Sequence, residues 1–109
     1  MPYIRTTVSK SINPGQRDIL KSKLGNAIAL IPGKSEAWLM LAFEDNMSMY
    51  FKGDNSADYA YVEVSLFGGA SDAAYDRLTA AISEIISETL GIDSSNIYIK
   101  YEEAEHWGW

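Results

Sequence analysis

The chain has 109 residues, a formal net charge of −6 and a sequence pI of about 4.6, which together predict one acidic domain over residues 1–109. Its 15 acidic and 9 basic residues argue against a nucleic-acid partner, and no apolar run reaches the ~20 residues of a membrane helix. The absence of cysteine excludes disulfides and thiolate chemistry, and the lone His106 cannot form a multi-histidine metal site. Because no apolar signal region opens the chain, we expect a cytoplasmic protein.

The first part of the chain predicts a strand followed by a helix. Residues Pro2–Val8 are rich in β-branched side chains and are predicted to form the first strand. Asn13 suits an N-cap and Pro14 the first helical position, so a helix should begin there, and Pro32-Gly33 should end it. Between these signals apolar residues recur at helical spacing and predict one buried face: Leu20, Leu24, Ala27, Ile28 and Ile31.

The remaining elements are strands and one further helix. We predict strands over residues 37–43, 59–67 and 97–101, and a short edge strand over residues 49–51. A second helix should extend from residue 71 to residue 91. Its predicted buried stripe consists of Ala74, Leu78, Ala81, Ile82, Ile85 and Ile86.

The two halves of the chain repeat one pattern. Residues 34–38 align with residues 94–98, sixty positions later, and each segment follows a helix and leads into a strand. Each half is a β-α-β unit whose right-handed crossover returns its second strand parallel to the first. The sequence therefore predicts an α/β (α+β) fold from a duplicated β-α-β unit: a four-stranded mixed sheet with two helices on one face.

The sheet face opposite the helices should carry large apolar side chains. If Val62 and Val64 face the helices, the alternation of a strand places Tyr61 on the other face, together with Trp38 and Met40. A patch of this kind is typical of a partner surface, and a small domain gains stability by covering it. We therefore expect a homo-oligomer; a monomer with a few exposed aromatic side chains is the alternative.

Pro2 is the first candidate for chemistry. Removal of Met1, which is usual before a small residue, would expose a secondary amine at the start of a strand. Burial and a nearby lysine would lower the pKa of that amine, which would make it a general base near neutral pH. While Met1 is retained, the Pro2 nitrogen is an amide without a basic lone pair. The alternative is an inert terminus.

Other segments could contact a ligand. Lys34, in a turn before a strand, could bind a carboxylate, and Gly68-Gly69 before a helix could offer backbone N–H groups to an anion. A solvated lysine and a tight turn that needs glycine are the ordinary alternatives. Trp107 and Trp109 indicate that the end of the chain packs onto something, plausibly a neighbouring subunit, and His106 is interpreted as a surface residue.

Six ordered elements span nearly the whole chain: Pro2 after Met1, Gly33-Lys34, Met49-Tyr50-Phe51-Lys52-Gly53, Ser65-Leu66 ahead of Gly68-Gly69, Ile97-Tyr98-Ile99, and Gly108-Trp109. With this set the chain resembles macrophage migration inhibitory factor and its bacterial relatives in the tautomerase superfamily. The resemblance implies a homotrimer whose sheets surround a central channel, with three active sites at subunit boundaries. It also implies cofactor-independent keto–enol tautomerisation of small 2-oxo acids, such as phenylpyruvate.

The resemblance also implies roles for individual residues. Pro2 would be the base that moves the proton, Lys34 would hold the substrate carboxylate, and the Leu66 N–H would donate a hydrogen bond to the substrate. Tyr98 would line the pocket from the adjacent subunit. Three further residues are placed at the substrate pocket by the same correspondence: Ser65, Lys100 and Trp109.

This sequence departs from the family pattern at several positions. Lys100 stands where the family commonly has an asparagine; it would either add a second cation to the pocket or point to solvent. Phe67 replaces a glycine, and two residues are missing before Gly68-Gly69. The thiol motif of the mammalian cytokine is absent, and so is the short extension beyond Trp109.

Two other functional classes remain open at this stage. One is a trimeric binding or signalling protein with a vestigial pocket. The other is a related superfamily chemistry, such as hydration or dehalogenation of an unsaturated acid, for which Lys100 and Glu102 would have to activate water.

Overall fold

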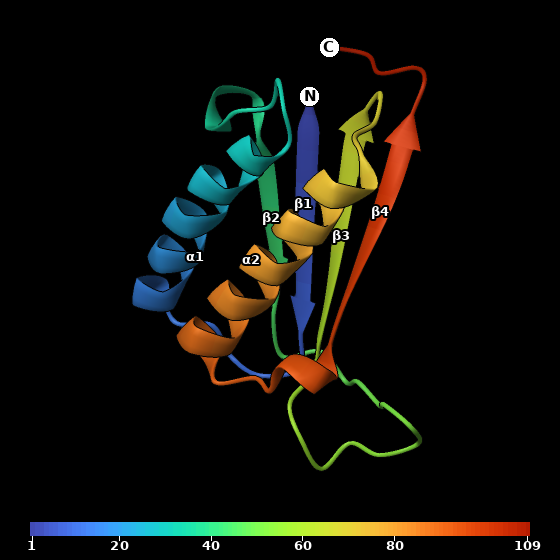
Figure 1. Cartoon of the computed structure of the whole chain (residues 1–109). Coiled ribbons are helices and arrows are strands. Elements are labelled where there is room, and N and C mark those ends of the chain that lie inside the picture. Colours follow the sequence, from blue (N-terminus) through green and yellow to red (C-terminus); the bar gives the residue numbers. More distant parts are fainter.

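Two parallel strand pairs, joined edge to edge, form the sheet of the computed structural model, which describes all of residues 1–109 (Figure 1). The order along the sheet is β2-β1-β3-β4. The elements are β1 (Pro2–Val8), α1 (Pro14–Ala27), β2 (Met40–Glu44), β3 (Ala60–Phe67), α2 (Asp72–Leu90) and β4 (Ile97–Ala104). β1 pairs parallel with β2, β3 pairs parallel with β4, and the central β1–β3 pair is antiparallel. The predicted duplicated β-α-β fold with a mixed four-stranded sheet is confirmed.

Local signals in the sequence account for the helix boundaries. The Asn13 side chain accepts a hydrogen bond from the Gln16 N–H at 2.8 Å, and the Gln16 side chain accepts one from the Asn13 N–H at 3.0 Å. The Ser71 side chain caps α2 by accepting a hydrogen bond from the Ala74 N–H, and Gly91 ends this helix with a left-handed φ of 70°. The α-helical part of the first helix ends at Ala27 and continues as a single 3₁₀ turn over Ile28–Leu30.

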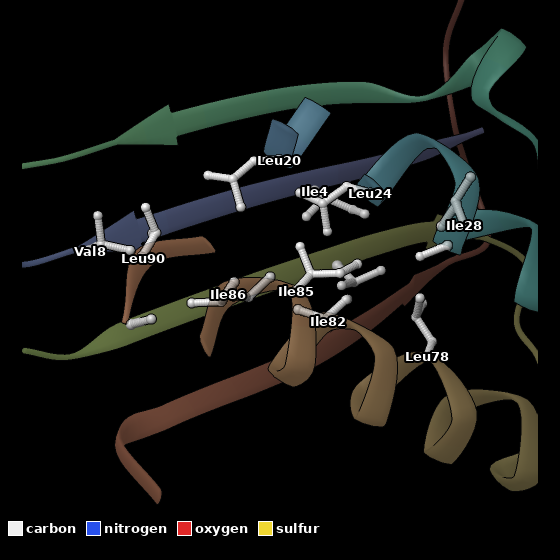
Figure 2. Packing of buried hydrophobic residues seen from close by; sticks show 14 of the residues in the cluster. Ile4, Val8, Leu20, Leu24, Ile28, Leu78, Ile82, Ile85, Ile86 and Leu90 are labelled. Carbon is white, nitrogen blue, oxygen red and sulfur yellow. The ribbon is translucent and has the colours of Figure 1, made fainter. Parts of the chain in front are cut away.

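Both helices cover the same face of the sheet, as predicted (Figure 1). Apolar side chains of α1 and α2 meet those of the central strands in one cluster, which Figure 2 shows from close by. Its fully buried members include Ile4, Val8, Leu20, Leu24, Ile28, Leu78, Ile82 and Ile86. Burial of this kind is the main stabilising term for a small domain. No helix in the structure is both long and apolar enough to cross a bilayer.

The prediction of a strand over residues 37–43 is wrong at its beginning. Residues Glu36–Trp38 form a 3₁₀ turn, and β2 begins only at Met40. The Glu36 carboxylate lies against Gly25 of α1, in space that a β-carbon would fill, so this segment stays on the helix before it joins the sheet. The repeat shares this feature, since a 3₁₀ turn over Ser94–Asn96 also precedes β4.

The short edge strand predicted over residues 49–51 is also absent. Phe51 makes only an isolated bridge to Asp54, with N–O distances of 2.8 and 3.0 Å. Between them Lys52 and Gly53 have φ values of 55° and 74°. Two successive left-handed residues close a tight turn, so the segment folds back on itself instead of extending along the sheet.

The face of the sheet away from the helices, here called the open face, is polar in the middle. Arg5 pairs with Glu44 at 2.5 Å and with Glu63 at 3.7 Å. Lys100 pairs with the same Glu63 at 3.8 Å and with Glu102 at 2.8 Å. These side chains form a band of alternating charge across all four strands, and the exposed apolar side chains lie at the two ends of the sheet.

Candidate active site

The proline end of the sheet, defined by Pro2, Phe67 and Trp109, brings together segments that are distant in sequence. Pro2 lies opposite Leu66 in the β1–β3 ladder. The Phe67 N–H donates to the Met1 carbonyl oxygen at 3.1 Å, and the Lys34 ammonium donates to the Phe67 carbonyl oxygen at 2.9 Å. Figure 1 shows both chain termini at this end.

The surroundings of the Met1 amine at the proline end disfavour its charged form. Burial lowers the pKa of the Met1 amine below its usual range, and the positive charge of Lys34 lowers it further. Both effects disfavour the ammonium form, since the charge is partly removed from water and lies beside another charge of the same sign. The environment therefore favours a neutral amine.

An open cleft of about 740 Å³ adjoins this amine on the open face. Ser65 and Trp109, both predicted site residues, line it beside Pro2. Trp38 and Met40 also line the cleft and are 62% and 68% exposed. Two members of the apolar patch predicted from the sequence therefore lie at the cleft, whereas the third, Tyr61, lies at the other end of the sheet. The remaining lining residues are Met1, Tyr3, Glu102, Glu103, Ala104, His106, Trp107 and Gly108.

Phe67 lies at the candidate site but was not predicted from the sequence to be a site residue. Its two backbone polar atoms face Met1 and Lys34, and its ring lies 6.0 Å from that of Trp109. The β1–β3 register could have indicated it, because a pair between Pro2 and Leu66 places Phe67 opposite Met1.

The backbone donor predicted at Leu66 faces another direction. In an antiparallel ladder successive N–H groups point to opposite sides. Since the Phe67 N–H points to β1, the Leu66 N–H points to β4. The Leu66 side chain is fully buried in the core.

Tyr98 lies at the other end of the sheet, which we call the loop end and define by Phe51, Tyr61 and Tyr98. It pairs with Tyr61, five positions along β3 from the partner of Pro2, or about 17 Å at the rise of a strand. Its ring contacts Phe51 edge to face at a centroid distance of 5.2 Å and is 61% exposed. One chain therefore does not bring Tyr98 to Pro2.

Lys100 lies on the open face within the band of charge. Its hydrogen bond to Glu102, followed by the one to Tyr61, raises the pKa of Lys100 above its usual range. Its charge is balanced by Glu102 and Glu63 within the same chain. Lys100 therefore lies in the band of charge on the open face, with 44% of its side chain exposed.

The Gly68-Gly69 turn already holds an anion from the protein itself. The Glu103 carboxylate occupies the space beside Gly69 that a β-carbon would fill, and the Tyr75 hydroxyl donates to Glu103 at 2.5 Å. Burial and the bond to Glu103 raise the pKa of Tyr75 to about 12, so this hydroxyl remains a donor at neutral pH. The turn is therefore filled by a side chain of the protein.

One other hollow of the surface contains none of the predicted site residues. A hollow of about 630 Å³ lies between α1 and the outer edge of β2 and is lined by Arg17, Lys21 and Phe43, among others. No group of three His, Asp or Glu side chains is arranged to hold a metal ion.

The family model described as macrophage migration inhibitory factor (MIF) matches residues 1–109. MIF2 of Leishmania major is 32% identical with a TM-score of 0.92, covering 100% of this chain and 93% of that one. A macrophage migration inhibitory factor homologue of Prochlorococcus marinus is 27% identical with a TM-score of 0.86, covering 98% and 94%. A fused 4-OT described as a symmetric trimer shares the fold at 18% identity and a TM-score of 0.83, covering 94% and 85%. No curated protein sequence matches the chain significantly.

Proposed function

Because the chain belongs to the macrophage migration inhibitory factor family of the tautomerase superfamily, we propose that it is a cofactor-independent keto–enol tautomerase of phenylpyruvate-type 2-oxo acids. Pro2 is the general base once Met1 has been removed, and we propose the cytoplasm as its location. The observation that carries this proposal is the Met1 amine beside Lys34, whose pKa is lowered by burial and by that charge, since removal of Met1 would leave the Pro2 amine in the same surroundings.

The reaction needs one group that accepts and returns a proton. The neutral Pro2 nitrogen removes a proton from C3 of the 2-oxo acid, and the C–H electron pair forms the C2–C3 double bond while the carbonyl electrons move to oxygen. The proton is then delivered to that oxygen, which gives the enol and the free amine. Lys34 binds the substrate carboxylate and fixes C3 near the base. A general base such as Pro2 increases the rate about a hundredfold to ten-thousandfold.

Removal of Met1 also releases a hydrogen-bond donor. The Met1 carbonyl oxygen is the acceptor of the Phe67 N–H, so its loss leaves this N–H free next to Pro2 and Lys34. The backbone donor to the substrate is therefore assigned to Phe67 in place of Leu66. A free N–H and an ammonium group that lie side by side suit a carboxylate, because both hydrogen bonds are charge-assisted.

The complete site needs a second copy of the chain. Pro2 and Tyr98 lie at opposite ends of the sheet, and both ends expose large apolar side chains, among them Trp38 at 62% and Tyr50 at 66%. Contact between the proline end of one copy and the loop end of the next is a head-to-tail interface, which closes when the copies form a ring. The trimeric relative with the same fold supports a ring of three.

A direct test uses two N-terminal variants of the trimmed protein in an assay of phenylpyruvate enol–keto exchange. Insertion of Ala between Met1 and Pro2 converts the amine into an amide and should nearly abolish turnover while the fold survives. Pro2→Gly keeps a terminal amine, which is primary and less fixed, and should retain a partial rate. Full activity in the insertion variant would exclude Pro2 as the base. No turnover in the trimmed protein without the insertion would favour a binding protein with a vestigial pocket.

A further inference from the structure

The turn between β3 and α2 is fixed by its neighbours rather than by bonds within itself. The Gly68 N–H donates to the Ala104 carbonyl oxygen of β4 at 2.9 Å. The Glu103 carboxylate, also from β4, fills the space beside Gly69. Tyr75, in the first turn of α2, donates its hydroxyl to Glu103 Oε2 at 2.5 Å. The turn is thus held between the end of β4 and the start of α2.

Tyr75 is in turn supported from the core side. The Tyr101 ring lies 4.5 Å from the Tyr75 ring, and the Tyr101 hydroxyl donates to the Tyr75 carbonyl oxygen at 3.2 Å. The same hydroxyl shares a 2.8 Å hydrogen bond with Thr79. Since Tyr101 packs against the hydrophobic cluster, the position of the Tyr75 hydroxyl is coupled to the core.

The residue just before this turn provides both backbone atoms of the candidate site. The Phe67 carbonyl oxygen accepts the Lys34 ammonium, and its N–H faces Met1. Any displacement of Gly68 or Gly69 therefore moves the acceptor that holds Lys34 beside the amine. The contacts of Glu103 and Tyr75 restrain that displacement.

We propose that Tyr75 and Glu103 are positioning residues: their hydrogen bond fixes the Phe67 peptide and, through it, places Lys34 to receive the substrate carboxylate. Neither side chain is assigned a contact with substrate. The inference rests on the proposed function for its kinetic test, and it has a second test that needs no activity.

The kinetic test uses two changes that break the same contact in different ways. Tyr75→Phe removes the donor, and Gly69→Ala introduces a β-carbon where the Glu103 carboxylate lies, so that this flexible side chain must move away. Each should raise the KM for phenylpyruvate about threefold to tenfold, the effect expected from one hydrogen bond. The kcat should change less than about twofold, and a methyl ester of the substrate should show no rise in KM.

Two further measurements separate positioning from general damage. In a Lys34→Ala background neither change should raise KM further, because the group they position is gone. Glu88→Ala removes a carboxylate of α2 that pairs only with Lys23, at 3.7 Å, and should leave both constants unchanged. Equal losses for acid and ester, or effects that add fully to that of Lys34→Ala, would overturn the proposal.

Amide hydrogen exchange tests the same restraint without substrate. The Gly68 amide should exchange faster in Tyr75→Phe than in the wild type, whereas Glu88→Ala should exchange at the wild-type rate. An unchanged Gly68 amide in Tyr75→Phe would overturn the positioning role. If Tyr75→Phe speeds exchange of the Gly68 amide but the wild-type protein has no tautomerase activity, the restraint by Tyr75 stands and the proposed function is rejected.

Discussion

Lys34 and the N-terminal amine form the smallest unit of the site. The ammonium of Lys34 is held by the Phe67 carbonyl oxygen, and its charge helps to keep the pKa of the amine low. In the proposed mechanism this one lysine has two effects, since it would attract the substrate anion and would favour the neutral form of the base. The two effects can be measured separately.

Lys34→Ala should weaken the binding of carboxylate substrates much more than that of their neutral esters. A lost charge-assisted hydrogen bond costs about 1.5–3 kcal/mol, or roughly tenfold to a hundredfold in KM for the acid. Steady-state kinetics with phenylpyruvate and its methyl ester would measure the difference. An equal loss for both substrates would show that Lys34 does not bind the carboxylate.

Lys100→Asn tests whether the second lysine acts on the base. In the structure Glu102 and Glu63 balance the charge of Lys100, so its removal should leave the acid limb of the pH–rate profile where it is in the wild type. A limb that moves to higher pH would mean that Lys100 acts on Pro2 as an unbalanced cation, because removal of a like charge favours the ammonium.

At the scale of strands and helices, periodicity and capping residues were sufficient to predict most of the fold. Asn13 and Ser71 start the helices as expected, and the alternation of Tyr61 with Val62 places the two faces of β3 correctly. The errors arose where a tertiary contact or a backbone angle decides the structure. The fit of Glu36 against Gly25 delays β2, and the left-handed Lys52 folds its segment back.

The sequence predicted several residues that lie at the candidate site, but it could not predict the contacts that depend on strand register or on packing between elements. Pro2 and Lys34 were assigned through the family resemblance, because each alone has an ordinary alternative, an inert terminus and a solvated lysine. The structure brings Met1 and Lys34 together at the Phe67 backbone. The direction of the Leu66 N–H depends on the strand register, which no local pattern specifies. The hydrogen bond between Tyr75 of α2 and Glu103 of β4 joins two elements that are distant in sequence, so no local sequence pattern predicts it.

Thr6, in the middle of β1, offers a test of the core. Its hydroxyl is fully buried and has no hydrogen-bond partner. Thr6→Val should raise the free energy of unfolding by about 1 kcal/mol, since it removes an unsatisfied polar group at nearly constant shape. Thr7→Val, on the less buried face of the same strand, is the matched control and should change it by less than about 0.5 kcal/mol. Chemical denaturation compares the two, and a destabilised Thr6→Val would contradict this description of the core.

At the scale of the whole molecule, the sheet has two apolar ends and a charged middle. The cleft at the proline end and the aromatic loop end each expose side chains that water solvates poorly, whereas the band from Glu44 to Glu102 can remain hydrated. Contacts between unlike ends would bury these apolar side chains and leave the charged band outside the contacts. In the proposed trimer, the assembly and the composite site would therefore depend on the same surfaces.

Light scattering at micromolar concentration should give about three times the 12.1 kDa mass of the chain. Tyr98→Glu places a charge at the loop end and should lower both the particle mass and the activity, because it disfavours burial of that end. A wild-type monomer with full tautomerase activity would contradict the composite site.

The pH dependence of kcat/KM for phenylpyruvate, measured on protein whose N-terminal mass shows Pro2 as its first residue, tests the central claim most directly. Burial and Lys34 lower the pKa of the Met1 amine, and we expect the same surroundings to lower the pKa of the Pro2 amine that replaces it. Because the neutral amine is the active form, the rate should fall as the pH falls through a value below the usual α-amino range of about 7.7–8.0. Protein that retains Met1 should show almost no turnover at any pH. A flat profile for the trimmed protein, or equal rates for the trimmed and Met1-retaining forms, would contradict the account.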